Sequence, residues 1–423
     1  MPLGYQMLGV YRVNQVMQQI QDVRDLPAEL LFLGRTPLVD AVDNEIMARF
    51  LGRIQIADII ADDQQAAVYN WGKINYETTA IPNIKVGSNM TQAMLNQLQS
   101  IDASGADPSG LFAGWEARLM DSLLTGVRQR IEALLVAMHL DSFNYNRLGI
   151  QSAGSWGMPA DLKVTTAVGW DQAATATPVS DILSLKRVAQ TRYGIVYDRA
   201  IMSQAAMSYM VATTDWQNHA RFVLPPGVPT SALPLQNTDY VKQLSLGILG
   251  LKEIDLYDYR YWSQNEAGVA SSAPYLPITN VILDAMANDN NGNVKDFANG
   301  VVTESIVSSL MPSQMIGRFT APVRGPIAYA TAPDDLNPPN VQYWSVARGF
   351  PRRHLLQMNG VLTVGTFTDP IPPTEPFLLD VEEAEAEPQA AETTAAETDT
   401  AASPAQAGAR PASASHEERR PGR

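Results

Sequence analysis

Residues 111–140 read LFAGWEARLMDSLLTGVRQRIEALLVAMHL, and this stretch decides the architecture of the chain. Its large apolar side chains recur every three or four residues, which is the spacing of one face of an α-helix. They are Leu111, Trp115, Leu119, Leu123, Val127, Ile131, Leu134 and Met138. Asp107 and Pro108 suit an N-cap and the first helical turn. The pattern predicts one helix roughly 45 Å long, more than twice the usual length. The alternative is a break near Gly126 that would leave two ordinary helices.

A hairpin is predicted upstream of this helix. Ile54 and Ile56 alternate with polar or small neighbours, and Tyr69 and Trp71 repeat that alternation after the polar run ADDQQ. Such alternation indicates strands, and the polar run indicates the tip between them. A hairpin alone is only marginally stable in water, so we expect it to lie on its own domain or on a neighbouring subunit. Residues 14–24 have the spacing of a short helix before it.

Downstream of the helix, the pattern alternates between helix and strand. The segment PVSDILSLKRVAQTRYG predicts a helix that ends at Gly194, and LPITNVILDA predicts a strand. We interpret residues 178–320 as an inserted module with its own helices and strands. From Gly325 onwards the sequence again has the pattern typical of antiparallel strands, and this pattern ends in NGVLTVGTFTD, residues 359–369. We expect this last strand to rejoin the domain that holds the long helix.

The last 44 residues have a different composition. Residues 380–423 contain no aromatic side chain, and Val381 is the only larger aliphatic one. Ten acidic and four basic side chains give the segment a net charge of −6 out of −14 for the whole chain. Such a segment buries too little apolar surface to offset its chain entropy. We predict a disordered tail that either solubilises the protein or serves as a docking segment.

The overall composition excludes several classes of function. The 423 residues carry a net charge of −14 and include no cysteine, so disulfides and thiolate sites are ruled out. The acidic balance lacks the basic footprint of a nucleic-acid-binding protein. No apolar run approaches a membrane span, and the N-terminus lacks a secretory signal pattern. Charged residues make up only 17%, which favours a surface partly buried against other copies or other partners; the alternative is a neutral polar surface on a monomer.

No motif indicates catalysis, a cofactor or a metal site. The four histidines, at 139, 219, 354 and 416, are far apart and lack the spacing of metal ligands. Residues 287–298 lack both essential carboxylates of a calcium loop, and no phosphate-binding glycine motif occurs. Adjacent carboxylates such as Asp62 and Asp63 suit solvated turns. We therefore predict no catalytic, cofactor-binding or metal-binding residue and no enzymatic activity.

The order of these elements resembles a known family. A hairpin arm, a long helix, an inserted module and a terminal strand occur in this order, with the phrases LPITNVILD (276–284), RGPIAYATAPDDLNPPN (324–340) and NGVLTVGTFTD (359–369). Together they resemble the major capsid proteins of tailed bacteriophages, which have the Hong Kong 97-type fold, and within them the lambda-like capsid protein E group. The resemblance covers about residues 26–369. It implies an α+β fold with an N-terminal arm, an extended hairpin loop, a peripheral domain with a spine helix, and an axial α/β domain.

The resemblance also implies how the chain is divided. The expected segments are an N-terminal arm (1–50), an extended hairpin loop (51–86), a peripheral domain (87–177) with its spine helix (111–140), an axial domain (178–320), peripheral return strands (321–379) and a disordered acidic tail (380–423). The residues expected at subunit interfaces, on the arm and the spine, are Ile54, Ile56, Tyr69, Trp71, Trp115, Arg128 and Arg130. We expect the terminal strand to complete the peripheral sheet.

The implied function is self-assembly. A member of this family would form pentamers and hexamers of an icosahedral head that encloses double-stranded DNA without reading its sequence. Its expected partners are a scaffolding protein and a portal, with a decoration protein as a further candidate partner, and it would need no cofactor and no membrane. It would assemble in the bacterial cytoplasm and remain in the virion. Two alternatives stay open here: an encapsulin-type compartment shell, and a hydrolase with a long helical arm.

Overall fold

A computed structural model describes residues 29–41, 46–50, 74–78, 81–90, 108–147, 150–223, 238–264, 270–302, 323–324, 326–331 and 341–367. Contacts divide the chain into a unit Met1–Pro376 and a unit Phe377–Arg423. All of the described residues belong to the first unit. The predicted short helix at 14–24 and the predicted tail at 380–423 lie outside the described residues.

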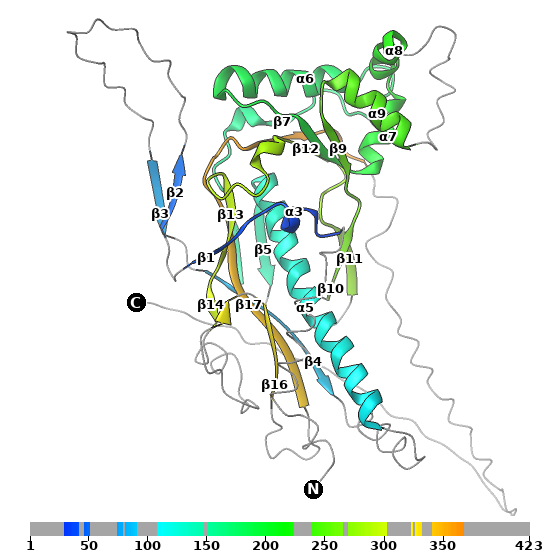
Figure 1. The fold of residues 1–423 in the computed structure, drawn as a ribbon. Helices are drawn as coiled ribbons and strands as arrows, with labels where there is room; N and C mark the ends of the chain where they lie inside the picture. The colour runs from blue at the N-terminus through cyan, green and yellow to red at the C-terminus, as the bar shows by residue number, and fades with distance from the viewer. Residues whose placement is uncertain are drawn as a thin grey trace, which may run out of the picture. The chain divides into compact units, whose positions relative to one another are not determined.

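The long helix is continuous. Helix α5 spans Pro108–Leu140 and runs diagonally through Figure 1. Gly126 does not break it, and the position of a Cβ there would be 3.8 Å from the Val86 side chain on a neighbouring strand. The helix ends because Asp141 adopts a left-handed backbone with φ 53°. The amides of Asp141 and Ser142 then donate to the Met138 and Ala137 carbonyls, which completes a Schellman-type C-cap.

The first sheet has five strands that pack along α5. Its order is β1-β13-β17-β16, and β4 also pairs with β17. These strands are β1 (Leu38–Asp40), β4 (Asn83–Met90), β13 (Lys295–Asn299), β16 (Ile327–Thr331) and β17 (Val341–Arg353). Ile84 on β4 and Ala347 on β17 share one hydrophobic core with Val127 and Leu134 of α5. The apolar face of α5 is therefore buried against this sheet.

The second sheet has the order β7-β18-β12-β8-β9. Its strands are β7 (Lys163–Thr165), β8 (Arg199–Met202), β9 (Glu253–Leu256), β12 (Asn280–Asp284) and β18 (Asn359–Thr363). Four helices cover one face (Figure 1): α6 (Pro178–Val188), α7 (Gln204–Ala212), α8 (Thr214–Val223) and α9 (Thr238–Leu249). Val281 and Leu283 belong to the core with these helices, whereas Ile282 belongs to the core with α5. The sheet is thus buried on both faces, and its central strands are continuously apolar.

The remaining elements are short. They are α3 (Leu31–Gly34), β2 (Ile46–Phe50), β3 (Ile74–Thr78), β5 (Phe143–Arg147), β6 (Ile150–Gly154), η1 (Ala160–Leu162), the π-helical turn η2 (Ala189–Tyr193), β10 (Arg260–Gln264), β11 (Ala270–Pro274), η4 (Met286–Asn288), β14 (Val301–Val302) and β15 (Val323–Arg324). Helix α6 continues into η2 and ends at Gly194, which has φ 71°. The predicted helix end at Gly194 is therefore confirmed, and β10 and β11 form an antiparallel pair.

The α+β class is confirmed, but the placement of the last strand is wrong. Strand β17 does join the sheet beside α5. Strand β18 instead pairs with β12 and β7 in the second sheet. Its Gly360 makes this possible, because a Cβ there would be only 3.1 Å from the Tyr197 ring and 3.2 Å from Leu185. The second sheet also takes β7 from outside residues 178–320, while β13 inside that range joins the first sheet.

Candidate functional site at the end of the long helix

The structure describes only part of the predicted interface. Ile54, Ile56, Tyr69 and Trp71 lie in residues 51–73, outside the described residues, between the antiparallel strands β2 and β3. Trp115 is in α5, but its side chain is not among those described. Arg128 and Arg130 are half-buried on α5, and Arg130 lines a cavity. These seven residues are therefore not brought together into one described site.

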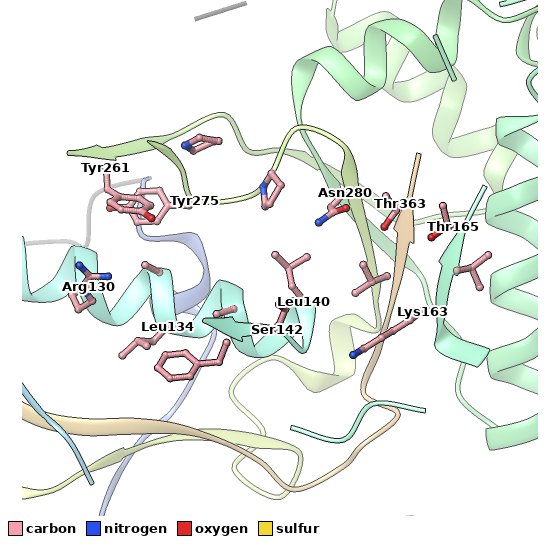
Figure 2. A pocket seen from close by; sticks show the side chains of 17 residues that line it. Arg130, Leu134, Leu140, Ser142, Lys163, Thr165, Tyr261, Tyr275, Asn280 and Thr363 are labelled. Atoms are coloured by element: carbon pink, nitrogen blue, oxygen red, sulfur yellow. The ribbon is translucent and has the colours of Figure 1, made fainter. Parts of the chain in front are cut away.

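The cavity lies between α5, the β10–β11 hairpin and the edge of the second sheet (Figure 2). It has a volume of about 630 Å³. Tyr261 and Tyr275 form its aromatic side, and Leu134 is among the α5 side chains that line it. Among the described lining residues, the charged ones are Arg130 and Lys163, and none is acidic. The cavity is therefore mainly apolar and aromatic, and Lys163 at its edge already pairs with Asp141.

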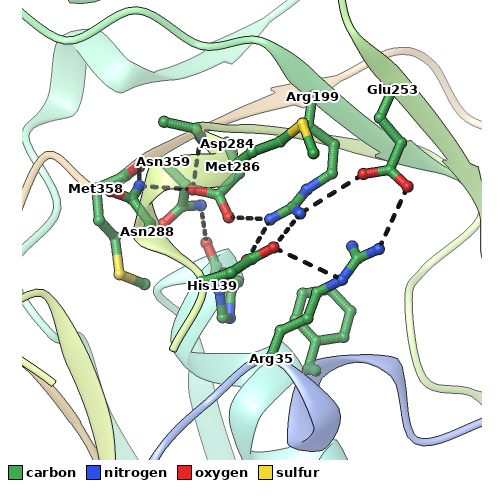
Figure 3. Close-up of polar contacts among 12 residues, drawn as sticks. Arg35, His139, Arg199, Glu253, Asp284, Met286, Asn288, Met358 and Asn359 are labelled. Atoms are coloured by element: carbon green, nitrogen blue, oxygen red, sulfur yellow. Dashed lines mark hydrogen bonds and ion pairs between the residues drawn. The ribbon is translucent and has the colours of Figure 1, made fainter. Parts of the chain in front are cut away.

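A buried ionic cluster lies at the C-terminal end of α5 (Figure 3). Arg199 on β8 is only 1% exposed. Its guanidinium donates to Asp284 at 2.9 Å and to both carboxylate oxygens of Asp289, at 2.6 and 2.7 Å. Burial alone would lower the pKa of Arg199, but the hydrogen bonds and charges of the two aspartates raise it instead. The guanidinium therefore remains charged and paired inside the protein.

Residues 29–41, which we call the strap, are tied to this cluster. Arg35 donates to Asp255 on β9 at 2.7 Å, and lies 3.6 Å from Glu253 and 3.9 Å from Asp289. The amide of Asn290 donates to the Arg35 carbonyl. The strap then continues as β1, which pairs in parallel with β13. It thus connects the edge of the second sheet to the first sheet.

His139, in the last turn of α5, is the titratable group at the centre. Its Nδ1 is 2.8 Å from the Leu135 carbonyl, and its Nε2 is 3.3 Å from Nζ of Lys295. Burial, and then the positive charge of Lys295, lower the pKa of His139 well below its usual value. A neutral ring with the proton on Nδ1 satisfies both contacts, because Nε2 can then accept from the ammonium group. Burial likewise lowers the pKa of Lys295.

Side chains from later in the chain complete the end of α5. The Arg353 guanidinium donates to the Met138 carbonyl at 3.1 Å, and Nδ2 of Asn359 donates to the His139 carbonyl at 2.7 Å. Lys163 on β7 forms an ion pair with Asp141. The last carbonyls of a helix have no partner within the helix. Here the strands of both sheets supply those partners, so the helix end is locked between them.

Glu132 anchors the strap to the middle of α5. It is fully buried, and its Oε1 and Oε2 lie 2.9 and 2.7 Å from the amides of Phe32 and Leu33. The Tyr257 hydroxyl is 2.7 Å from Oε1. These amides begin the short helix α3, whose first N–H groups have no partner within the helix. A carboxyl group from the long helix therefore caps the strap.

Sequence reasoning did not single out these charged residues. Each of Glu132, Arg199 and Asp284 interrupts or borders an apolar run, as in RIEALL, DRAIM and VILD. A charged residue at a core position of a periodic segment was the available signal. Within the described residues, no cluster of three potential metal ligands occurs, and no helix there is long and apolar enough to span a membrane. Asp284 and Asp289 are paired with Arg199, whereas the hydrogen-bond partners of Glu132 are two backbone amides and the Tyr257 hydroxyl.

Comparison with known proteins gives a family match. The sequence model described as phage major capsid protein E matches residues 49–288. This range includes all of α5 and four of the five strands of the second sheet. No curated protein matches the chain.

Several solved structures are similar at low identity. A capsid protein of an E. coli prophage is 13% identical, over 84% of this chain and 99% of that chain, with a TM-score of 0.48. A phage-related protein from Bordetella bronchiseptica is 12% identical, over 82% and 96%, with a TM-score of 0.43. The satellite phage P4 procapsid, in a structure with its size determination protein, is 8% identical, over 84% and 91%, with a TM-score of 0.41. At these scores the family match carries the assignment.

Proposed function

This chain belongs to the phage major capsid protein E family, and we propose from that premise that its copies form the pentamers and hexamers of an icosahedral phage head around double-stranded DNA. The observation that carries the proposal is the family match over more than half of the chain. Family membership implies a structural, non-enzymatic role in the virion shell. The finer parts of the proposal are the Hong Kong 97-type arrangement, the absence of catalysis, and assembly in the host cytoplasm with scaffolding, portal and decoration proteins.

The arm between β2 and β3 is proposed as the contact between neighbouring copies. Residues 53–65 read RIQIADIIADDQQ and combine four isoleucines with three aspartates. The cavity beside α5 offers the complementary surface, with aromatic walls and the cations Arg130 and Lys163. Burial of the isoleucines against these apolar and aromatic walls would provide most of the affinity. This assignment keeps Ile54, Ile56, Tyr69, Trp71 and Trp115 as proposed interface residues beside Arg128 and Arg130.

The helical side of the second sheet is proposed to meet other copies around the symmetry axes. Phe222 at the end of α8 is 89% exposed, and Val223 and Tyr240 nearby in the helical layer are also exposed. Several exposed apolar side chains in one helical layer are the kind of surface that another chain can cover. The acidic balance of the chain, at −14, suits a container that holds DNA without binding it tightly.

Electron microscopy of the full-length protein, alone and with its neighbouring genes, tests the proposal. We expect capsomers of five or six copies, or closed shells that protect DNA from nuclease. Removal of residues 58–70 should leave a folded subunit that does not assemble. The matched control is removal of residues 380–423, which should leave assembly intact. A monomer under every condition, or shells that contain protein cargo and no DNA, would overturn the proposal.

A further inference from the structure

The Tyr257 hydroxyl is close to two oxygen atoms that cannot both accept its proton. It lies 2.7 Å from Oε1 of Glu132 and 2.6 Å from the backbone carbonyl oxygen of Glu29, the first residue of the strap. Both distances are typical of O–H···O hydrogen bonds. A phenol carries one proton, a backbone carbonyl carries none, and an ionised carboxylate carries none. Two short contacts therefore share a single proton if Glu132 is ionised.

The two short contacts of the Tyr257 hydroxyl need two protons, and the phenol supplies only one. With Glu132 ionised, one of the two contacts would place lone pairs against each other at less than 2.8 Å, in a buried environment that strengthens repulsion. With a proton on Oε1, the chain runs from Glu132 to the Tyr257 oxygen and from the Tyr257 hydroxyl to the Glu29 carbonyl. Oε2 still accepts from the Leu33 amide. The Phe32 amide donates to the same Oε1 at 2.9 Å, and the protonated oxygen can accept this bond through its remaining lone pair.

We propose that Glu132 is a neutral carboxylic acid when the strap is seated, and that its proton latches the entry of the strap onto the long helix. After proton loss from Glu132, the Tyr257 hydroxyl could donate either to the carboxylate or to the Glu29 carbonyl, but not to both. The strap would then lose the contact at its first residue. Arg35, six residues further on, would still hold the strap to β9.

The surroundings of Glu132 agree with this protonation state. Burial raises the pKa of Glu132, and this outweighs the hydrogen bonds from Tyr257, Phe32 and Leu33 and the positive charge of Arg35. The charged and titratable groups on the packed elements are Arg35 and Glu29 of the strap, Arg130 of α5, and the phenols of Tyr257 and Tyr275. Glu132 in turn raises the pKa of Tyr257, so that phenol keeps its proton.

The sign of the pH dependence follows from linkage. An exposed glutamate has a pKa of about 4.3, whereas the seated state holds its proton to higher pH. Between these two pKa values, opening the strap releases one proton, so the opening constant rises about tenfold per pH unit. The strap is therefore held most tightly in acid and loosens as pH rises through the raised pKa of Glu132. This places a proton-sensitive contact between the N-terminal part of the chain and the body of a shell subunit.

Two measurements on the full-length protein test the latch. Infrared difference spectroscopy detects the carbonyl stretch of a buried carboxylic acid. Amide hydrogen exchange, corrected for the intrinsic pH dependence of unprotected peptides, reports the opening of the Phe32 and Leu33 amides. The variants are Glu132→Gln and Tyr257→Phe. Tyr259→Phe is the matched control, because the neighbouring Tyr259 side chain is exposed.

We expect a carboxylic acid band that persists above the ordinary glutamate pKa of about 4.3 in the wild type and in Tyr259→Phe, and its loss in Glu132→Gln. Protection of the strap amides should fall up to tenfold per pH unit in the wild type and stay flat in Glu132→Gln. In Tyr257→Phe the band should shift or vanish, because its hydrogen-bond acceptor is gone. Identical spectra for the wild type and Glu132→Gln would overturn the proposal. If Glu132→Gln does not fold, an unchanged band in Tyr257→Phe would do so.

Discussion

The two faces of the second sheet are built from different chemistry. Toward α6–α9, the sheet contributes side chains such as Leu283 and Met202 to a large apolar core that also contains Trp170 and Trp216. Toward α5, Ile201 and Ile282 are apolar, but Arg199 and Asp284 at the strand ends are charged and buried. Neighbouring residues on the same strand thus face a dry core on one side and an ionic cluster on the other.

The two faces of the second sheet make different contributions: the apolar face mainly stabilises the subunit, and the polar face mainly fixes how its elements are aligned. Apolar burial is proportional to area and depends little on direction, so the helical face contributes mainly stability, and its close packing limits the size of each side chain. Buried ion pairs are net stabilising only with good geometry, because charges are costly to remove from water. The polar face therefore fixes how the strap, α5 and β13 are aligned against the sheet.

The largest expected loss of stability comes from removing a buried ion pair on the polar face. Arg199→Met should lower the free energy of unfolding by about 3–5 kcal/mol, because Asp284 would be left buried without its main partner. Urea denaturation of the unassembled subunit measures this. The control is Arg192→Met, which removes a pair with Asp161 of similar length, 2.8 Å, on a side chain that is 60% exposed. The control should cost less than about 1 kcal/mol. Equal costs for the two variants would show that the buried cluster has no special role.

The elements of the fold were predictable where the signal is local. The apolar spacing of three or four residues continues over all 30 residues of 111–140. In the structure the helix begins only three residues earlier, at Pro108. The predicted strand within 276–284 is β12, and the helix end at Gly194 has the expected left-handed backbone. Each of these depends on residues within a few positions of one another. Local spacing and propensity are therefore sufficient to identify them.

Pairing between distant strands was not predictable in the same way. Strands β17 and β18 are separated by five residues but enter different sheets. Nothing in NGVLT shows which strands it pairs with, because its apolar residues would suit a buried strand in either sheet. The ionic cluster has the same origin: Arg199 and Asp289 are 90 positions apart, and Glu132 and Phe32 are 100 apart. Only the charged residues within apolar runs marked these positions in the sequence.

On the apolar face, truncation of a buried side chain is expected to lower the free energy of unfolding by an amount usual for a protein core. Leu283→Ala should cost about 3 kcal/mol through lost burial and a residual cavity. Leu183→Ala on α6 is the control, because that side chain is partly exposed, and we expect less than about 1 kcal/mol there. Both are measured by the same urea titration. A cost for Leu283→Ala below that of the control would mean that the helical layer is loosely packed.

Tight packing on the apolar face predicts a smaller cost for adding a single carbon atom. Gly360→Ala places a Cβ 3.1 Å from the Tyr197 ring and 3.2 Å from Leu185. Because those neighbours must move by a few tenths of an ångström, we expect a loss of about 1–2 kcal/mol. Gly114→Ala in α5 has open space around the new Cβ and should be neutral or stabilising. A neutral Gly360→Ala would show that the apolar face adjusts as freely as solvent-exposed helix.

The smallest expected effect lies at the margin of the polar face, where Lys163 on β7 pairs with Asp141 at the end of α5. Burial would raise the pKa of Asp141, but hydrogen bonds from Lys163 and Ser155 outweigh it and lower that pKa. The ionised pair therefore stabilises the subunit above the unfolded pKa of about 3.9. That stability is lost as pH falls through the lowered pKa.

Since the Lys163 side chain is 37% exposed, solvent screens the pair, and Lys163→Met should cost only about 0.5–1 kcal/mol at neutral pH. The difference between wild type and variant should vanish in acid, where Asp141 is protonated in both. A difference that stays constant down to acid pH would mean that Lys163 contributes through the packing of its alkyl chain beside the cavity. The margin of the polar face would then behave like the apolar face, and the contrast between the two faces would be confined to the buried cluster around Arg199.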